Sequence, residues 1–288
     1  MKLIKTPTKG MNDYLPPDAE IRDYLQSVII DTYKNSGFEH IITPVLEDAE
    51  NLDKSEGGEN LNLIFKVLKR GEKLNRALEA GDASKLSDMG LRYDLTVPLS
   101  RYYSNNASVL PLPFKAMQIG PVWRADRPQK GRFRQFHQCD IDIFGDPTNS
   151  AEIELITATS TFLEEAGVKG CTVMINDRRI LSAMARASGF AEDQFSTVFI
   201  ILDKYDKIGE AGIEKELLAE GYAPEAVAKY MEIFRGAMAA EDRFAYLEGV
   251  LGDAIEEGVL ANLKEIVESV ALISDGRFDL DFDVTLVR

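Results

Sequence analysis

Residues 124–142 hold the side chains best suited to chemistry, because cationic, aromatic, amide and acidic groups follow one another there. Successive side chains of a strand point to opposite faces, so a strand over residues 132–144 would gather every second one on a single face. That face would carry Arg132, Arg134, Phe136, Gln138, Asp140, Asp142 and Phe144. Arginine binds phosphate oxygens through paired donors, a phenylalanine ring stacks on a flat base, and an amide or carboxylate binds an ammonium or imidazole N–H. We therefore predict a nucleotide next to a small cationic or polar molecule on this face.

The residues alone leave a second interpretation open. Arginine, glutamine and aspartate are also common on a solvated outer face, so the same pattern fits a hairpin that binds nothing. The opposite side carries His137 and Cys139 and turns apolar toward Ile143, so we expect it to meet the core. We interpret His137 as a partly buried structural histidine, and His40 in the same way.

The helices and strands that must position this face are predicted from the periodicity of apolar residues and from the glycines and prolines that end these elements. A hairpin is predicted, with a strand over 114–125, a turn over 126–131 and a returning strand over 132–144. Arg124 would then lie across the turn at the phosphate end. Elsewhere the pattern predicts a helix from an N-cap at Asp18 to a stop at Gly37, and further helices after 94 through 103 and over 150–166. Strands are predicted over 38–43, 63–68, 91–94 and 171–175. A loop is predicted over 51–60 and a turn over 69–72.

The C-terminal part of the chain has a different composition. Residues 176–274 are helical in pattern and acidic, and residues 189–270 carry 18 acidic against 7 basic side chains, or −11 of the net charge of −15. Residues 278–286 alternate apolar and polar like a half-buried strand. We predict an α+β protein with a core over 1–175, a helical insertion module over 176–274 and a returning core strand over 275–288. The chain stops directly after that strand, so we expect a fragment.

The sequence lacks the motifs that are typical of several classes of protein. The chain has no glycine-rich phosphate loop, no dinucleotide-binding turn and no nucleophile elbow. Its two histidines and two cysteines follow no metal-ligand spacing, so we expect no metal held by protein ligands alone. There is no apolar run of about 18 residues and no secretory signal, and we expect a cytosolic protein. Against the acidic total, residues 124–134 carry a local charge of +4.

Residues 124–138, RADRPQKGRFRQFHQ, resemble motif 2 of the histidyl-tRNA synthetases, which are class II aminoacyl-tRNA synthetases. Residues 91–96 resemble the segment of that family that lines the amino-acid pocket, residues 37–44 resemble motif 1, and residues 9–16 resemble the N-terminal segment. The likeness runs over nearly the whole chain and is weakest from about 210 to 265. It implies an antiparallel sheet flanked by helices, with an inserted helical module.

The resemblance also implies a role for individual residues. Arg124 would bind the α-phosphate of ATP, with Arg132, Arg134 and Asp126 near the phosphates and Phe136 stacked on adenine. Asp94, Thr96 and Gln138 would hold the ammonium group and backbone of histidine, and Asp142 its imidazole ring. Relatives often have glutamate at the position of Asp142, and some have it at Asp94. Arg127, Gln129 and Lys130 would contact the acceptor end of tRNA, and Arg288 would act on the α-phosphate.

By the same resemblance, the protein would activate histidine with ATP and Mg²⁺ and transfer it to the 3′ end of tRNA(His), as a homodimer joined through motif 1. The family's motif 3 and anticodon-binding domain have no counterpart here, so we expect these 288 residues to have little or no activity alone. An alternative is the regulatory subunit of ATP phosphoribosyltransferase, which shares the fold. The intact motif 2 and the long helical insertion argue against that alternative.

Overall fold

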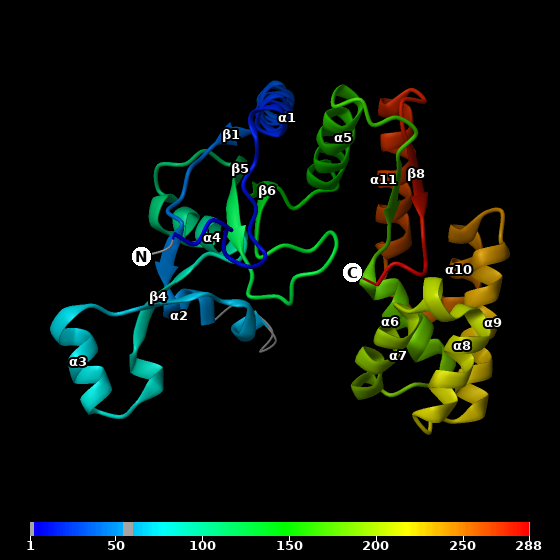
Figure 1. The fold of residues 1–288 in the computed structure, drawn as a ribbon. Coiled ribbons are helices and arrows are strands. Elements are labelled where there is room, and N and C mark those ends of the chain that lie inside the picture. Colours follow the sequence, from blue (N-terminus) through cyan, green and yellow to red (C-terminus); the bar gives the residue numbers. More distant parts are fainter. Residues whose placement is uncertain (1–2, 54–59, 288) are drawn as a thin grey trace. The chain divides into compact units, whose positions relative to one another are not determined.

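A computed structural model describes residues 3–53 and 60–287 of the 288-residue chain. The fold is α+β, as predicted, and it divides into two compact units, Met1–Pro147 and Thr148–Arg288 (Figure 1). Among the described residues, no helix has the length and apolar character needed to cross a membrane. Arg288, predicted to act on the α-phosphate, lies outside the described residues.

The first unit begins with helix α1, Pro16–Asn35. Proline is favoured in the first turn of a helix because its missing N–H has no partner there anyway. The predicted N-cap at Asp18 was therefore wrong, since the helix begins two residues earlier and Asp18 lies in its first turn. The predicted stop at Gly37 is confirmed by its φ of 84° and by the bond from Phe38 N–H to the Tyr33 carbonyl.

The central sheet of this unit has the strand order β1-β5-β6. Strand β5, Phe114–Trp123, pairs antiparallel with β6, Gln135–Phe144, over ten residue pairs, which confirms the predicted hairpin. Strand β1, Glu39–His40, pairs parallel with β5 and is shorter than the predicted strand over 38–43. Helix α4, Thr96–Asn106, stacks Tyr103 on Phe144 and packs Leu99 near Phe114.

A second sheet, β2-β4-β3, is built from Leu46–Asp48, Ser87–Leu91 and Lys66–Leu68. The strand predicted over 91–94 therefore ends at Leu91, and Asp94 lies in the turn before α4. The predicted turn over 69–72 was wrong in its second half, because helix α3, Gly71–Glu79, begins there and leads to η2, Ala83–Lys85. The predicted loop over 51–60 begins inside α2, Ala49–Asp53, and ends in η1, Asn60–Leu63, while residues 54–59 lie outside the described residues.

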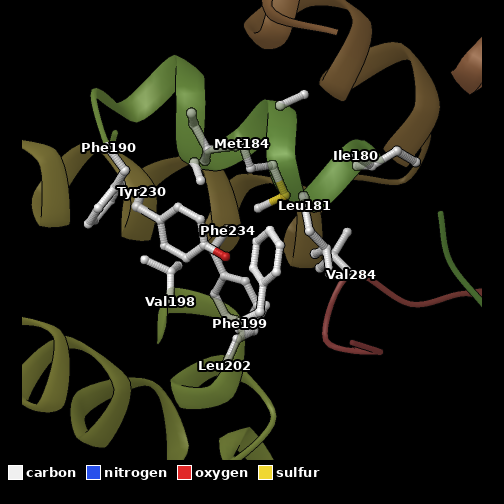
Figure 2. Packing of buried hydrophobic residues seen from close by; sticks show 14 of the residues in the cluster. Ile180, Leu181, Met184, Phe190, Val198, Phe199, Leu202, Tyr230, Phe234 and Val284 are labelled. Carbon is white, nitrogen blue, oxygen red and sulfur yellow. The ribbon is translucent and has the colours of Figure 1, made fainter. Parts of the chain in front are cut away.

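The second unit is mostly helical, as predicted, and its strands β7, Thr172–Ile175, and β8, Asp279–Phe282, pair in parallel. Its remaining elements are α5 Ser150–Glu165, α6 Arg178–Ser188, η3 Glu192–Gln194, α7 Phe195–Leu202, α8 Tyr205–Ala219, α9 Pro224–Ala239, α10 Arg243–Leu251, η4 Gly252–Ala254 and α11 Val259–Ser274. No strand occurs between residues 176 and 274, all of which are described. Phe199, Tyr230 and Phe234 lie in the largest core cluster (Figure 2).

The compact units differ in extent from the predicted domains. Helix α5 and strand β7, which we assigned to a core over 1–175, pack with α11 and β8 in the second unit around Val270 and Phe278. The division into catalytic core, insertion module and returning strand therefore stays a prediction. Strand β8 is shorter than the predicted strand over 278–286, although Phe278, Phe282 and Val284 are buried as the alternation requires.

Candidate active site

The candidate site is built on one face of the β5–β6 hairpin. The register places Gln138 opposite Gly120, Asp140 opposite Gln118 and Asp142 opposite Ala116, so these six residues share a face. Phe136 belongs to the same face at one end, and Phe144 closes it at the other end against α4. The structure therefore brings together the strand residues that the sequence analysis grouped from Phe136 to Asp142.

Arg124 joins this face directly after β5. Its guanidinium lies over the Phe136 ring, 5.1 Å from the ring centroid, and its Nε donates to the Tyr93 carbonyl at 3.0 Å. These two contacts hold the arginine beside the aromatic platform. The arrangement leaves a cation next to a flat ring, which is the combination that a nucleotide phosphate and base require.

Asp94 and Thr96 lie where the chain enters helix α4. Asp94 Oδ1 accepts from the Val97 N–H at 3.2 Å, so this carboxylate caps the helix. Burial raises the pKa of Asp94, and its bond to Val97 and the charge of Arg124 oppose that rise. Thr96 begins the helix with an exposed side chain. The turn therefore brings Asp94 to the hairpin face within electrostatic reach of Arg124.

Three polar side chains of β6 lack partners on this face. The Gln138 Oε1 atom is buried and accepts no hydrogen bond from the described part of the chain. Asp140 and Asp142 are half-buried and form neither a hydrogen bond nor an ion pair with residues 3–53 or 60–287. Buried polar groups are nearly always paired in folded proteins, so unpaired ones on a shared face indicate a ligand site.

Burial raises the pKa of the carboxylates on this face, and Asp140 is raised further by its acidic neighbours. Burial raises the pKa of Asp140 to about 6, the charges of Asp142 and Asp94 add to the rise, and Arg124 opposes it. Burial also raises the pKa of Asp142. Arg124 acts on only two of the three carboxylates, Asp94 and Asp140, so the face keeps an excess of negative charge and attracts a cationic ligand.

The hairpin tip carries the remaining predicted residues. Arg132 and Arg134 precede β6, so the prediction that they belong to the strand was wrong. The tip bends because Gln129 and Arg132 exchange backbone hydrogen bonds around Gly131, and the Arg132 Nε lies 3.7 Å from the Asp126 carboxylate. Arg134 Nε donates to the Asp126 carbonyl at 3.0 Å. Arg127, Gln129, Lys130 and Arg132 are exposed at the tip, and so is the ring of Phe133.

The opposite face of the hairpin meets helix α1. His137 and Cys139 line a pocket of about 410 Å³ there, together with Arg22, Leu25 and Ile29 of the helix. Arg22 Nη2 donates to His137 Nδ1 at 2.9 Å, so His137 lies on the face away from the acidic cluster. His137 is exposed, so the prediction that it is partly buried was wrong, although its bond to Arg22 gives it a partner. The expectation that this side meets the core was wrong, because Phe133 and His137 are exposed and Cys139 is only half-buried. The buried β5 residues Ala116, Gln118 and Gly120 lie on the site face instead.

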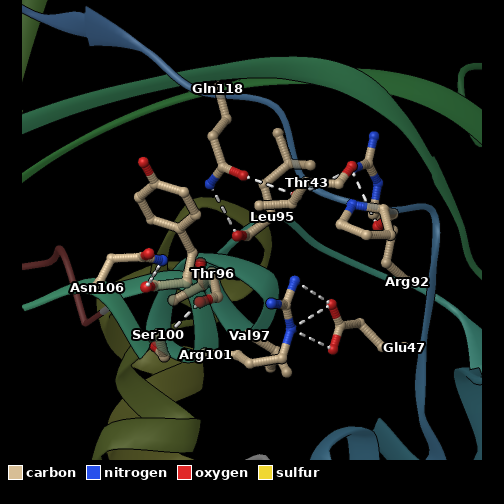
Figure 3. Close-up of polar contacts among 12 residues, drawn as sticks. Thr43, Glu47, Arg92, Leu95, Thr96, Val97, Ser100, Arg101, Asn106 and Gln118 are labelled. Atoms are coloured by element: carbon tan, nitrogen blue, oxygen red, sulfur yellow. Dashed lines mark hydrogen bonds and ion pairs between the residues drawn. The ribbon is translucent and has the colours of Figure 1, made fainter. Parts of the chain in front are cut away.

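Buried polar groups behind the site were not predicted from the sequence. Arg92 is 4% exposed and donates to the Pro121 carbonyl at 3.0 Å and to the Thr43 carbonyl at 2.9 Å (Figure 3). Gln118 accepts from the Thr43 hydroxyl and donates to the Leu95 carbonyl, both at 3.0 Å. These bonds fix the turn that carries Asp94 against β5. An arginine and a glutamine inside apolar runs were the only sequence signal for them.

Comparison with known proteins identifies the family. A family model described as histidyl-tRNA synthetase matches residues 10–288. The chain belongs to the histidyl-tRNA synthetase family. A curated histidine–tRNA ligase of Leifsonia xyli is 49% identical over 226 residues, which cover 77% of this chain and 52% of that relative. The chain thus spans about half the length of this relative.

Solved structures agree on the fold of this synthetase-family chain. The crystal structure of a histidyl-tRNA synthetase from Nostoc matches with a TM-score of 0.82 and 25% identity, covering all of this chain and 62% of that one. A Bacillus halodurans protein described as an ATP phosphoribosyltransferase regulatory subunit/histidyl-tRNA synthetase matches with a TM-score of 0.77 and 18% identity, covering 99% and 69%. That second likeness shows the fold alone, so it adds nothing for the regulatory-subunit alternative.

Proposed function

We propose that this chain is the catalytic part of a histidine–tRNA ligase. It would join histidine and ATP to form histidyl-adenylate and pyrophosphate, and then pass the histidyl group to the 3′ end of tRNA(His). The observation that carries the proposal is the shared face on which Arg124, Phe136, Gln138 and Asp142 lie beside Asp94. This face combines a phosphate-binding cation, an aromatic platform and partnerless groups suited to a cationic amino acid.

Histidine would occupy the acidic end of the face. Asp94, Thr96 and Gln138 would bind its ammonium group and backbone, and the buried Gln138 Oε1 would gain a donor on binding. Asp142 would accept from the imidazole ring. A site built from buried hydrogen-bonding groups rejects amino acids that leave those groups unpaired, which would provide the specificity for histidine.

ATP would occupy the end with Arg124. The substrate carboxylate is already a nucleophile, so the first step needs alignment and charge stabilisation rather than a protein nucleophile. Arg124 would bind the α-phosphate, Phe136 would stack on adenine, and Asp126, Arg132 and Arg134 would border the phosphates. Mg²⁺ would arrive with ATP and neutralise charge on the outer phosphates.

The remaining partners are proposed on surface features. Arg127, Gln129 and Lys130 are exposed at the hairpin tip, where they would contact the tRNA acceptor end. A second copy would pack on motif 1, residues 37–44, where the side chain of Ile42 is 83% exposed. Weak adenylate formation by these 288 residues stays a prediction, and robust histidine-dependent ATP–pyrophosphate exchange would contradict it.

The ring-binding role of Asp142 can be tested by histidine titration. Asp142→Ala should weaken histidine binding by about tenfold or more, because a charge-assisted hydrogen bond to the imidazole is lost. Isothermal titration of the unaltered chain and the variant measures this ratio. The matched control is Asp88→Ala, since Asp88 is a half-buried aspartate of β4, in the other sheet of the same unit. Equal affinities of the unaltered chain and Asp142→Ala would refute the role.

A further inference from the structure

Asp140 lies in the middle of the site face and has no assigned role there. It sits opposite Gln118 in the β5–β6 register, between Gln138 and Asp142 along β6. Neighbours on one face of a strand are about 6.5–7 Å apart, so all three can reach one small molecule. Strand geometry alone therefore places the Asp140 carboxylate inside the proposed histidine site.

No residue in the described part of the chain forms an ion pair with this carboxylate. Asp140 forms no hydrogen bond with these residues either, and Gln118, the residue facing it, is engaged with Thr43 and Leu95. Arg124, whose charge opposes the pKa rise of Asp140, donates its Nε to the Tyr93 carbonyl and lies over the Phe136 ring instead of pairing with Asp140. A half-buried carboxylate in this position is unfavourable in the absence of a ligand.

The electrostatic neighbours of Asp140 indicate which end of the ligand it meets. The groups that act on it are Asp142 from β6, Asp94 from the turn before α4, and Arg124 from the segment after β5. The pKa of Asp142, by contrast, is raised by burial, and neither Asp94 nor Arg124 contributes to its shift. Asp140 is therefore the β6 carboxylate on the Asp94 side of the face, toward the groups assigned to the ammonium group rather than to the ring.

We propose that Asp140 is a further substrate-binding residue, whose carboxylate binds the α-ammonium group of histidine together with Asp94. This inference rests on the proposed function. One Asp94 oxygen already accepts from the Val97 N–H, so a second carboxylate supplies a further acceptor for the three N–H donors of an ammonium group. The buried Gln138 Oε1 beside it is a third acceptor for the same group.

Substrate binding should then involve the ionisation of Asp140. Its pKa of about 6 means that much of the carboxyl is protonated below neutrality, and an ammonium ligand requires the ionised form. The benefit of Asp140 to histidine affinity is expected to be small near pH 5 and full near pH 8. The ratio of affinities between the unaltered chain and Asp140→Asn isolates this effect, because the ionisation of the ligand cancels in the ratio.

The test uses histidine and its analogue in which a hydroxyl replaces the ammonium group. Asp140→Asn should raise the dissociation constant for histidine by about tenfold or more at pH 8, from the loss of a charge-assisted bond. The same variant should bind the hydroxyl analogue as well as the unaltered chain does. Asp140→Glu should restore part of the affinity for histidine, and Asp88→Asn, the same change in the other sheet, should have no effect on either ligand.

The outcomes separate this inference from the proposed function. If the unaltered chain binds no histidine, the proposed function fails and the role of Asp140 fails with it. If it binds histidine but Asp140→Asn binds equally well, or loses the same factor for histidine and for the hydroxyl analogue, only the ammonium role of Asp140 is overturned. Thermal unfolding of each variant shows that the proteins compared are folded.

Discussion

At the scale of the residue, Asp140 imposes a cost on the folded protein that depends on pH. Its pKa is about 6 in the folded chain and near the ordinary value of 3.8 in the unfolded chain. Between these values the folded protein keeps a proton that the unfolded chain has lost. The free energy of unfolding therefore falls as the pH rises from about 4 to about 6.

Asp140→Asn should remove this cost. We expect the variant to be more stable than the unaltered chain by about 1–2 kcal/mol near pH 8, after allowance for solvent screening, and equally stable near pH 3.5. Chemical unfolding at the two pH values measures the difference. If the variant were less stable than the unaltered chain near pH 8, Asp140 would have a stabilising partner in the folded protein, and its ionised form would not be destabilising in the absence of a ligand.

At the scale of the element, β2 and α4 are joined behind the site by an ion pair whose carboxylate is buried and whose arginine is partly buried. Glu47 is 4% exposed, and its carboxylate accepts from Arg101 Nε at 2.8 and 2.9 Å (Figure 3). Glu47→Gln should lower the free energy of unfolding by about 2 kcal/mol or more, because the arginine loses its charge partner in a partly buried position.

A surface pair of the same type is the matched control for Glu47. Glu72 and Arg76 on α3 form an i,i+4 pair with side chains 86% and 76% exposed, so Glu72→Gln should cost less than about 0.5 kcal/mol. Urea unfolding of both variants gives the comparison. Equal losses would show that burial does not strengthen the Glu47–Arg101 pair.

The elements also show what the sequence could predict. Helix α1 and strands β5 and β6 were located because their apolar period is regular and glycine or proline ends them. Helix α3 was missed because its start, Gly71, follows a basic segment that resembles a turn. The alternation along β6 predicted the shared face correctly. It could not show that Arg132 lies in the tip or that Asp94 lies within electrostatic reach of Asp140, since tertiary contacts decide both.

At the scale of the whole molecule, the charge is distributed unevenly. The chain carries a net charge of −15, whereas residues 124–134 carry +4. Phosphate backbones are bound by lysine and arginine, and each neutralised phosphate makes affinity more sensitive to salt. An acidic protein that binds tRNA through one basic loop should therefore show a shallow salt dependence, set by the few cations of the hairpin tip.

Lys130→Gln tests this distribution of charge. Lys130 is exposed at the tip, so its loss should weaken binding of an acceptor-stem RNA hairpin and reduce the slope of log affinity against log salt by about one. Lys229→Gln removes another exposed lysine, from α9 in the acidic module, and it should change neither quantity. Both slopes come from titrations at several salt concentrations. If Lys229→Gln reduced the slope as much as Lys130→Gln does, the RNA would contact the acidic module as well, and the hairpin tip would not be the main cationic contact.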